Sequence, residues 1–359
     1  MKYRTATLMA REDLGASGVK VHDVKIMDPI SMLLFKIEVA VKATARLTHT
    51  LEAISKIELV DGTDVLESIS ASQMNAIHFY DTGKLANPAS GGIPSQDEVV
   101  YDALLFGRWQ HDPLYAFDPT KYRNPQIRVT YDATAVTLLA DHVYLTILAD
   151  CFDEKKITPA GFFQNREFYR YDTGRNAYKY IALPTDLVLR KLFAQARHDF
   201  HEPGKHLAEA KLSEDNDKRI PFDLAARNWR ALCLHRFGWC QELIVTTQES
   251  VDWPIWGAPA AINQALVNCV TAGKTVQLIG ATGGKILFDD GAANDSTLTG
   301  MHKGILPHAM FCYPFGDQND PADWYDPTKI GGLELRILDG TDVPDGAVTR
   351  VTLQQVRKY

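Results

Sequence analysis

One short segment occurs twice in this chain, and the repeat constrains the fold more than any other feature. Residues 112–121 read DPLYAFDPTK and residues 320–329 read DPADWYDPTK, so six of ten positions are identical. At the same spacing, Ile127 matches Leu335 and Val143 matches Val351. A second match, in the same order, pairs the region after residue 56 with the region after residue 210. Two ordered matches indicate an internal duplication, so we predict two related domains.

Apolar and polar residues alternate with a period of two along most of the chain. Such runs, rich in Val, Ile, Thr and Tyr, occupy residues 36–42, 126–131, 143–148, 334–338 and 348–353. Turn pairs such as Asp61-Gly62 and Asp339-Gly340 separate them. This pattern is typical of half-buried antiparallel strands.

Helical pattern is short and sparse. We expect helices near 71–80 and 224–236, the second with Asp223 as its N-cap, and a third over 258–270. Strands and helices do not alternate regularly, which disfavours a parallel α/β sheet.

The fold class predicted from these patterns is all-β. We expect two tandem eight-stranded antiparallel jelly rolls, a double jelly roll, with a few short helices. The expected organisation is an N-terminal arm at 1–14, a first jelly roll at 15–152, a linker at 153–164 and a second jelly roll at 165–359. The spacing between the matches grows from about 155 to 208 residues, so the second copy carries an insertion within 237–311.

Charge and composition narrow the function classes. The net charge is −7 and no Lys/Arg run or basic tail occurs, so direct, sequence-specific nucleic-acid binding is not expected. The five cysteines form no CxxC pair, which predicts free thiols instead of a zinc site or a disulfide framework. The first residues lack the apolar core of a signal peptide, and no apolar run is long enough to span a membrane.

Residues at the repeat resemble the P2-type coat protein family. KIELVDG at 56–62 with ISAS at 69–72 is similar to the N-terminal jelly roll of that family. DPTK at 118–121 with IRVTY at 127–131 is similar to its closing part. The family comprises the double jelly-roll major capsid proteins of icosahedral, membrane-containing bacteriophages. The tandem organisation extends the resemblance over nearly the whole chain.

This resemblance implies a structural subunit and not an enzyme, with no catalytic, cofactor-binding or metal-binding residues. It implies a homotrimer of pseudo-hexagonal outline that contacts neighbouring capsomers, penton proteins and minor capsid proteins. The barrels would stand perpendicular to an icosahedral shell, with towers outside and an internal lipid membrane beneath. The insertion within 237–311 is then the expected tower, and residues 1–20 the expected contact with neighbours or lipid. The expected location is the virion, after synthesis in the host cytoplasm.

Three groups of polar residues are candidates for ligand sites. His198, His201 and His206, with Asp199 and Glu202, form the densest group, but their spacing places the imidazoles on no single strand face, which favours a solvated loop. Side-chain oxygens that could bind Ca²⁺ occur at Asp289-Asp290 and Asn294-Asp295. This segment matches no EF-hand, and we interpret it as a polar turn. Ala272-Gly273-Lys274-Thr275 resembles the end of a phosphate-binding loop. The first glycine of that motif is missing, so we interpret this segment as a turn too.

Other motifs favour structural roles. The two DPTK segments are expected to form corners, because Asp before Pro favours an extended or turn residue. Trp253, Trp256 and Trp324 lie in loop-like contexts, where they either anchor subunit interfaces or pack locally. No G-x-S-x-G elbow occurs.

Two other functions stay open beside the capsid subunit. A two-domain jelly-roll glycan hydrolase would be a monomer with convergent acids in a cleft between the barrels. A carbohydrate- or receptor-binding protein would present an exposed aromatic platform, with or without Ca²⁺.

Overall fold

The first half of the chain forms one complete jelly roll. In the computed structural model, its strands are ordered β1-β9-β3-β7 in one sheet and β2-β8-β4-β5 in the other, with antiparallel neighbours. The strands are β1 (Tyr3–Asp13), β2 (Ser17–Asp23), β3 (Ile30–Ala40), β4 (Ile54–Asp61), β5 (Asp64–Ile69), β7 (Asp97–Leu105), β8 (Pro125–Asp132) and β9 (Val143–Phe152). The structure describes residues 2–40, 47–87, 89–90, 97–137, 140–198, 201–248, 253–270, 277–289 and 296–359.

The second half repeats this topology strand for strand. Its sheets are ordered β10-β23-β12-β21 and β11-β22-β13-β14. The strands are β10 (Gly161–Asp172), β11 (Tyr178–Leu183), β12 (Leu189–Arg197), β13 (Leu207–Glu214), β14 (Arg219–Ala225), β21 (Met310–Pro314), β22 (Leu333–Asp339) and β23 (Val348–Lys358). The predicted fold class, a double jelly roll, is therefore confirmed.

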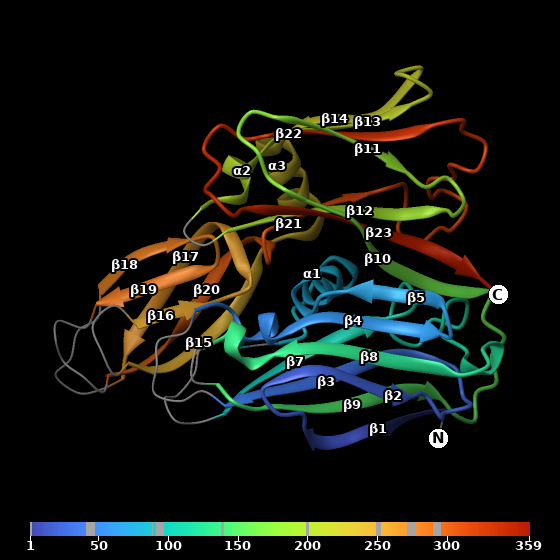
Figure 1. Ribbon diagram of the computed structural model, residues 1–359, viewed down its shortest axis with the longest axis horizontal. Coiled ribbons are helices and arrows are strands. Elements are labelled where there is room, and N and C mark those ends of the chain that lie inside the picture. Colours follow the sequence, from blue (N-terminus) through green and yellow to red (C-terminus); the bar gives the residue numbers. More distant parts are fainter. Residues whose placement is uncertain are drawn as a thin grey trace.

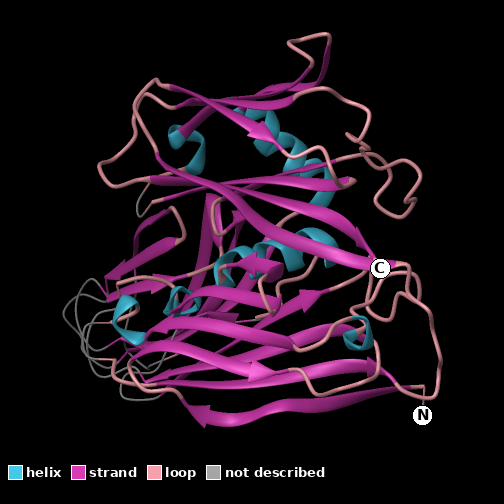
Figure 2. Cartoon of the chain, turned by 45° about the vertical axis from the view of Figure 1, so that its right-hand side comes forward, coloured by secondary structure: helices cyan, strands magenta, loops and turns pink. Residues whose placement is uncertain are grey.

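The two jelly rolls meet edge to edge. Strand β5 of the first lies beside β10 of the second, with Ser68 opposite Arg166 in a parallel bridge, so that eight strands form one sheet. In Figure 1 the sheets follow one another from the blue strands at the bottom to the red and yellow strands at the top. Figure 2 shows helices enclosed between the sheets. A single apolar core runs through both rolls.

Each jelly roll carries one long helix at the same place in its topology. Helix α1 (Ala71–Thr82) follows β5, and α3 (Ala226–Phe237) follows β14. Ser70 starts α1 with a capping box, because its hydroxyl accepts from Gln73 N and the Gln73 side chain accepts from Ser70 N. Both predicted helices are present. However, the expected N-cap of the second is wrong, because Asp223 pairs with Lys211 inside β14.

The duplication is visible in matching backbone contacts. Phe117 exchanges backbone hydrogen bonds with Ile30 at the start of β3, and Tyr325 exchanges them with Leu189 at the start of β12. The sequence match of β9 with β23 is displaced, however. Ala149 and Leu353 occupy equivalent positions opposite β3 and β12, so the true spacing there is four residues shorter than in the DPTK match.

Two further sequence-based expectations are wrong in this structure. Residues 1–14 do not form an arm, because Tyr3–Asp13 is strand β1 and pairs with β9. Residues 258–270 do not form a helix, because Pro259–Cys269 is strand β17. From Ile262 onward β17 alternates exposed and half-buried residues, which is the period of a strand. It is an edge strand, and its pairing with β20 (Ser296–Pro307) satisfies the backbone polar groups on that side.

The insertion forms two further sheets beside the jelly rolls, in orange at the left of Figure 1. Their orders are β17-β20-β15-β6 and β16-β19-β18, packed around Ile244, Ile255, Ile286 and Leu298. The strands not yet given are β6 (Ala89–Ser90), β15 (Cys240–Gln248), β16 (Trp253–Trp256), β18 (Gln277–Thr282) and β19 (Lys285–Asp289). Strand β6 comes from the first jelly roll and pairs with β15. The short helices are η1 (Thr50–Ala53), η2 (Pro119–Lys121), η3 (Ala133–Ala135) and α2 (Pro203–His206).

Trp229 should contribute strongly to the stability of the second jelly roll. Its ring is fully buried against Phe311, and its indole N–H donates to the carbonyl of Cys312 at 2.8 Å. We expect Trp229→Ala to lower the free energy of unfolding by about 3–5 kcal/mol. Urea denaturation followed by circular dichroism measures the loss. Trp109→Ala, at an exposed tryptophan, is the matched control and should change stability by only about 0.5 kcal/mol. Equal losses in the two variants would contradict this account.

Candidate functional site at the junction of the jelly rolls

Helix α1 is wedged between the two jelly rolls. Nine of its twelve residues are buried, although it belongs to the first roll only. One side packs on its own roll, where the Asn75 amide reaches Asp102 of β7. The other side meets the second roll, where the Gln73 amide donates to Glu167 of β10 at 2.7 Å. The Tyr80 hydroxyl donates to the carbonyl of Met310 in β21.

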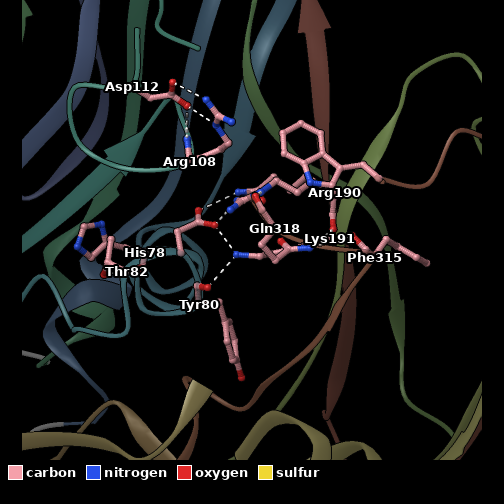
Figure 3. A network of polar contacts seen from close by, with 12 residues as sticks. His78, Tyr80, Thr82, Arg108, Asp112, Arg190, Lys191, Phe315 and Gln318 are labelled. Atoms are coloured by element: carbon pink, nitrogen blue, oxygen red, sulfur yellow. Dashed lines mark hydrogen bonds and ion pairs between the residues drawn. The ribbon is translucent and has the colours of Figure 1, made fainter. Parts of the chain in front are cut away.

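Asp81, at the end of α1, is the charged centre of this junction. Its carboxylate accepts from Arg190 at 2.5 Å, from Lys191 and from the Gln354 amide at 2.9 Å. Lys191 also donates to the carbonyl of Tyr80 at 2.8 Å (Figure 3). The charged side chains of Asp81, Arg190 and Lys191 are at most 2% exposed. One anion of the first roll thus neutralises part of the charge of two buried cations of the second.

The electrostatics of the network follow from its burial. Burial alone would raise the pKa of Asp81, but the nearby Lys191 and Arg190 outweigh it and hold the pKa at about 2. Burial lowers the pKa of Lys191, and Arg190 pushes it in the same direction, while Asp81 opposes both. The Arg190 guanidinium also lies 4.5 Å from the centre of the Phe163 ring. Because its pKa is held at about 2, the Asp81 carboxylate is ionised at neutral pH.

Further polar contacts join the rolls along the same line. The backbone N–H of Asn165 donates to the buried carboxyl of Glu67 at 2.8 Å. Arg108 forms an ion pair with Asp112 (Figure 3) and donates to the carbonyl of Asn319 at 2.7 Å. The hydroxyl of Tyr359, the last residue of the sequence, donates to the carbonyl of Ala116 at 2.7 Å. Specific polar contacts thus join the two rolls on either side of helix α1.

The two DPTK segments form the same turn. Asp118 accepts from the backbone N–H and the hydroxyl of Thr120 at 3.1 and 2.6 Å. Asp326 accepts from the same groups of Thr328 at 3.0 and 2.7 Å. Both aspartates hold corners of the fold, as the sequence predicts.

The histidine cluster is closer than its sequence spacing suggested. The rings of His198, His201 and His206 have centres 5.2 to 6.0 Å apart, because β12, α2 and β13 bring them together. His206 is buried and not in a solvated loop, and burial with the two neighbouring imidazoles lowers its pKa to about 4. Within the described part of the chain, no three His, Cys, Asp or Glu side chains are arranged to hold a metal ion.

The other candidate site residues are dispersed, and several lie outside the described residues. Asp289 ends β19, whereas Asp290, Asn294, Asp295, Asp199 and residues 272–275 lie outside the described residues. Trp256 and Trp324 are buried, so neither is exposed on this chain as an interface anchor. Trp324 packs on Phe163 and on Tyr115 of the first roll. Trp253 lies in β16. The helices in the described ranges are all too short or too polar to cross a membrane.

Sequence reasoning missed the network around Asp81. The signal was present in the pattern, since Arg190 and Lys191 interrupt an apolar strand between Leu189 and Leu192. Two adjacent cations there require an anion, but only the fold identifies it as a residue 110 positions away.

Two jelly rolls in tandem, joined through one sheet, define the double jelly-roll class, and comparisons with solved structures agree. The chain matches the STIV major capsid protein with a TM-score of 0.61 and 10% identity, over 99% of this chain and 96% of that one. It matches the major capsid protein P2 of bacteriophage PM2 with a TM-score of 0.57 and 10% identity, over 99% and 98%. For VP54 of PBCV-1 the values are 0.60 and 10%, over 99% and 93%. No protein-family model and no curated protein matches the sequence. The similarity therefore establishes a shared fold, which is that of double jelly-roll major capsid proteins.

Removing the charge of Asp81 should weaken the junction strongly. Asp81→Asn leaves Arg190 and Lys191 buried without their anion, so we expect the free energy of unfolding at pH 7 to fall by about 3–5 kcal/mol. Denaturant titration measures it. Asp345→Asn, at a fully exposed carboxylate, is the control and should leave stability unchanged. A stable Asp81→Asn protein would show that the network does not hold the rolls together.

Asp81 should also make the protein sensitive to acid. Its folded pKa, about 2, lies below the ordinary value of 3.8, so its contribution is complete above about pH 4 and is lost as the pH falls from 4 to 2. The amount is roughly 2 kcal/mol. Denaturation midpoints across this range should therefore fall further in the wild type than in Asp81→Asn. Parallel pH curves for the two proteins would contradict this assignment.

Proposed function

We propose that this chain is a viral major capsid protein, a structural subunit that forms homotrimeric, pseudo-hexameric capsomers of an icosahedral shell. The supporting observation is the junction between the rolls. The first roll contributes its β5 edge and α1, while the second contributes its β10 edge and the sheet that receives α1. Two equivalent domains are thus joined through unlike surfaces, which is a head-to-tail contact.

A head-to-tail contact can continue from chain to chain. The first roll still offers the edge at β1, the counterpart of β10, and the second still offers the edge at β14, the counterpart of β5. If a second copy joins these surfaces as the two rolls are joined within one chain, and if each junction turns the next roll by one sixth of a circle, three copies close a ring of six rolls. This is how two similar domains produce a hexagonal unit from three subunits.

The likeness to viral major capsid proteins over nearly the whole of both chains supports the same role. We propose that the subunit works without a cofactor, in the virion, after synthesis in the host cytoplasm. Its proposed partners are neighbouring capsomers, penton and minor capsid proteins, and an internal lipid membrane. The insertion, which stands beside both rolls, is the proposed tower.

The hydrolase alternative is not favoured. It requires a cleft between the barrels with convergent acids. The pocket between the described rolls does hold Glu52 and Glu167, but Glu52 is paired with Arg197, and Glu167 accepts from Gln73 and lies beside Arg350. Both acids are thus engaged in contacts that join the rolls.

The mass of the purified protein in solution tests this proposal. We expect multi-angle light scattering to give three times the chain mass of 40.1 kDa, over a wide range of protein concentrations. A monomer at all accessible concentrations would argue against the capsid role and in favour of a binding module.

A further inference from the structure

Helix α3 is the counterpart of α1, residue by residue. Both have twelve residues, and both end at a glycine with positive φ, Gly83 and Gly238. Both pack on their own roll through equivalent buried residues, Met74 in α1 and Trp229 in α3. Position 71 of α1 thus corresponds to position 226 of α3, and this register continues along both helices.

The outer sides of the two helices differ in burial. The second roll covers α1, of which nine residues are buried, but only three residues of α3 are. The exposed side of α3 carries Arg227, Asn228, Ala231, His235 and Arg236. Ala76, the counterpart of Ala231, is fully buried. Helix α3 therefore presents the side that is covered in α1.

The surface that would receive α3 is also open. Strand β12 lies in the sheet that receives α1, and eight of its nine residues are buried. In its counterpart β3, the alternate residues Met32, Leu34 and Lys36 are only half-buried. Beside them on β7, Val99 and Tyr101 are exposed.

The two open surfaces carry opposite charges at one equivalent position. Arg236 stands at the position of Asp81. Gln354, a partner of Asp81, lies opposite Lys191, and its counterpart Asp150 lies opposite Met32 in the equivalent register. Within the chain, a helix anion meets cations of the sheet. Between copies, the helix cation Arg236 would meet the sheet anion Asp150. In the single chain Arg236 donates to the carbonyl of Pro314, and Asp150 accepts from Gln110 and lies 2.9 Å from the His111 ring nitrogen, so the new pair would add to these contacts or replace them.

A second polar pair follows from the same register. The Gln73 amide bonds Glu167, which precedes a one-residue bulge in β10. The same bulge follows Thr7 in β1, so Thr7 is the counterpart of Glu167. The counterpart of Gln73 is Asn228, whose amide suits the exposed hydroxyl of Thr7.

From these correspondences we infer that α3 of one copy docks on the sheet β1-β9-β3-β7 of a second copy, with Arg236 facing Asp150 of that copy. The inference rests on the proposed homotrimer and assigns the surface that forms it. It makes the contact between subunits a repetition of the contact within each subunit.

Charge reversal tests the pairing. We expect Arg236→Asp and Asp150→Arg each to raise the concentration at which trimers dissociate by about tenfold or more. The double variant Arg236→Asp/Asp150→Arg should recover much of the loss. Arg175→Asp, at an exposed arginine in the loop between β10 and β11, is the control and should assemble like the wild type. Light scattering over a dilution series gives the result, and circular dichroism confirms that each variant is folded.

Ala231→Trp is an independent variant, because the residue is exposed in the single chain and would be covered in the trimer. It should fold and remain monomeric. Single reversals and Ala231→Trp that all trimerise like the wild type would overturn the role of α3 and leave the trimer standing. Single reversals that weaken assembly without recovery in the double variant would overturn the Arg236–Asp150 pairing. A monomeric wild type would overturn both the trimer and this surface.

Discussion

The arrangement of this protein depends on one buried ion network. Asp81 closes a helix of the first jelly roll, and its carboxylate neutralises Arg190 and Lys191 on a strand of the second. Burying two adjacent cations costs free energy that only a correctly placed anion can offset. The network therefore fixes the position of the second roll against the first, in addition to holding them together. Apolar contacts supply most of the stabilisation, since the core is continuous through both rolls, but they tolerate sliding in a way that a buried charge does not.

The two jelly rolls of one chain meet through unlike surfaces. The first roll therefore keeps one of these surfaces unpaired, and the second roll keeps the other. This is a geometric property of the topology, and it explains why one helix is enclosed while its counterpart is exposed. It also explains why β12 is buried on both sides while β3 keeps the alternation of a half-exposed strand. The charge at the end of the helix is reversed between the two jelly rolls of the chain, with Arg236 in α3 in place of Asp81 in α1. Such a reversal would discriminate the contact within the chain from the contact between chains, because each helix then repels the surface meant for the other.

Much of the fold could be predicted from the sequence, because its signals are local. Alternation revealed the strands, and the DPTK repeat revealed the duplication, since an Asp before Pro forms the same corner wherever the fold requires it. What escaped prediction depends on tertiary pairing. Strand β17 has a mixed pattern that is resolved only by its partner β20, and residues 3–13 become a strand only because β9 offers an edge. The anion for Arg190 and Lys191 is distant in sequence, and the histidines converge only through α2. No local pattern encodes such contacts.

In the proposed trimer we expect the six rolls of three chains to be arranged as near-equivalents, so that each contact between chains copies the junction within a chain. Class averages of negatively stained particles, prepared at concentrations where the protein is fully assembled, test this most directly. The account predicts threefold particles with six lobes of similar size in a closed ring. Two-lobed single chains, or threefold particles whose rolls are not spaced as near-equivalents, would contradict it.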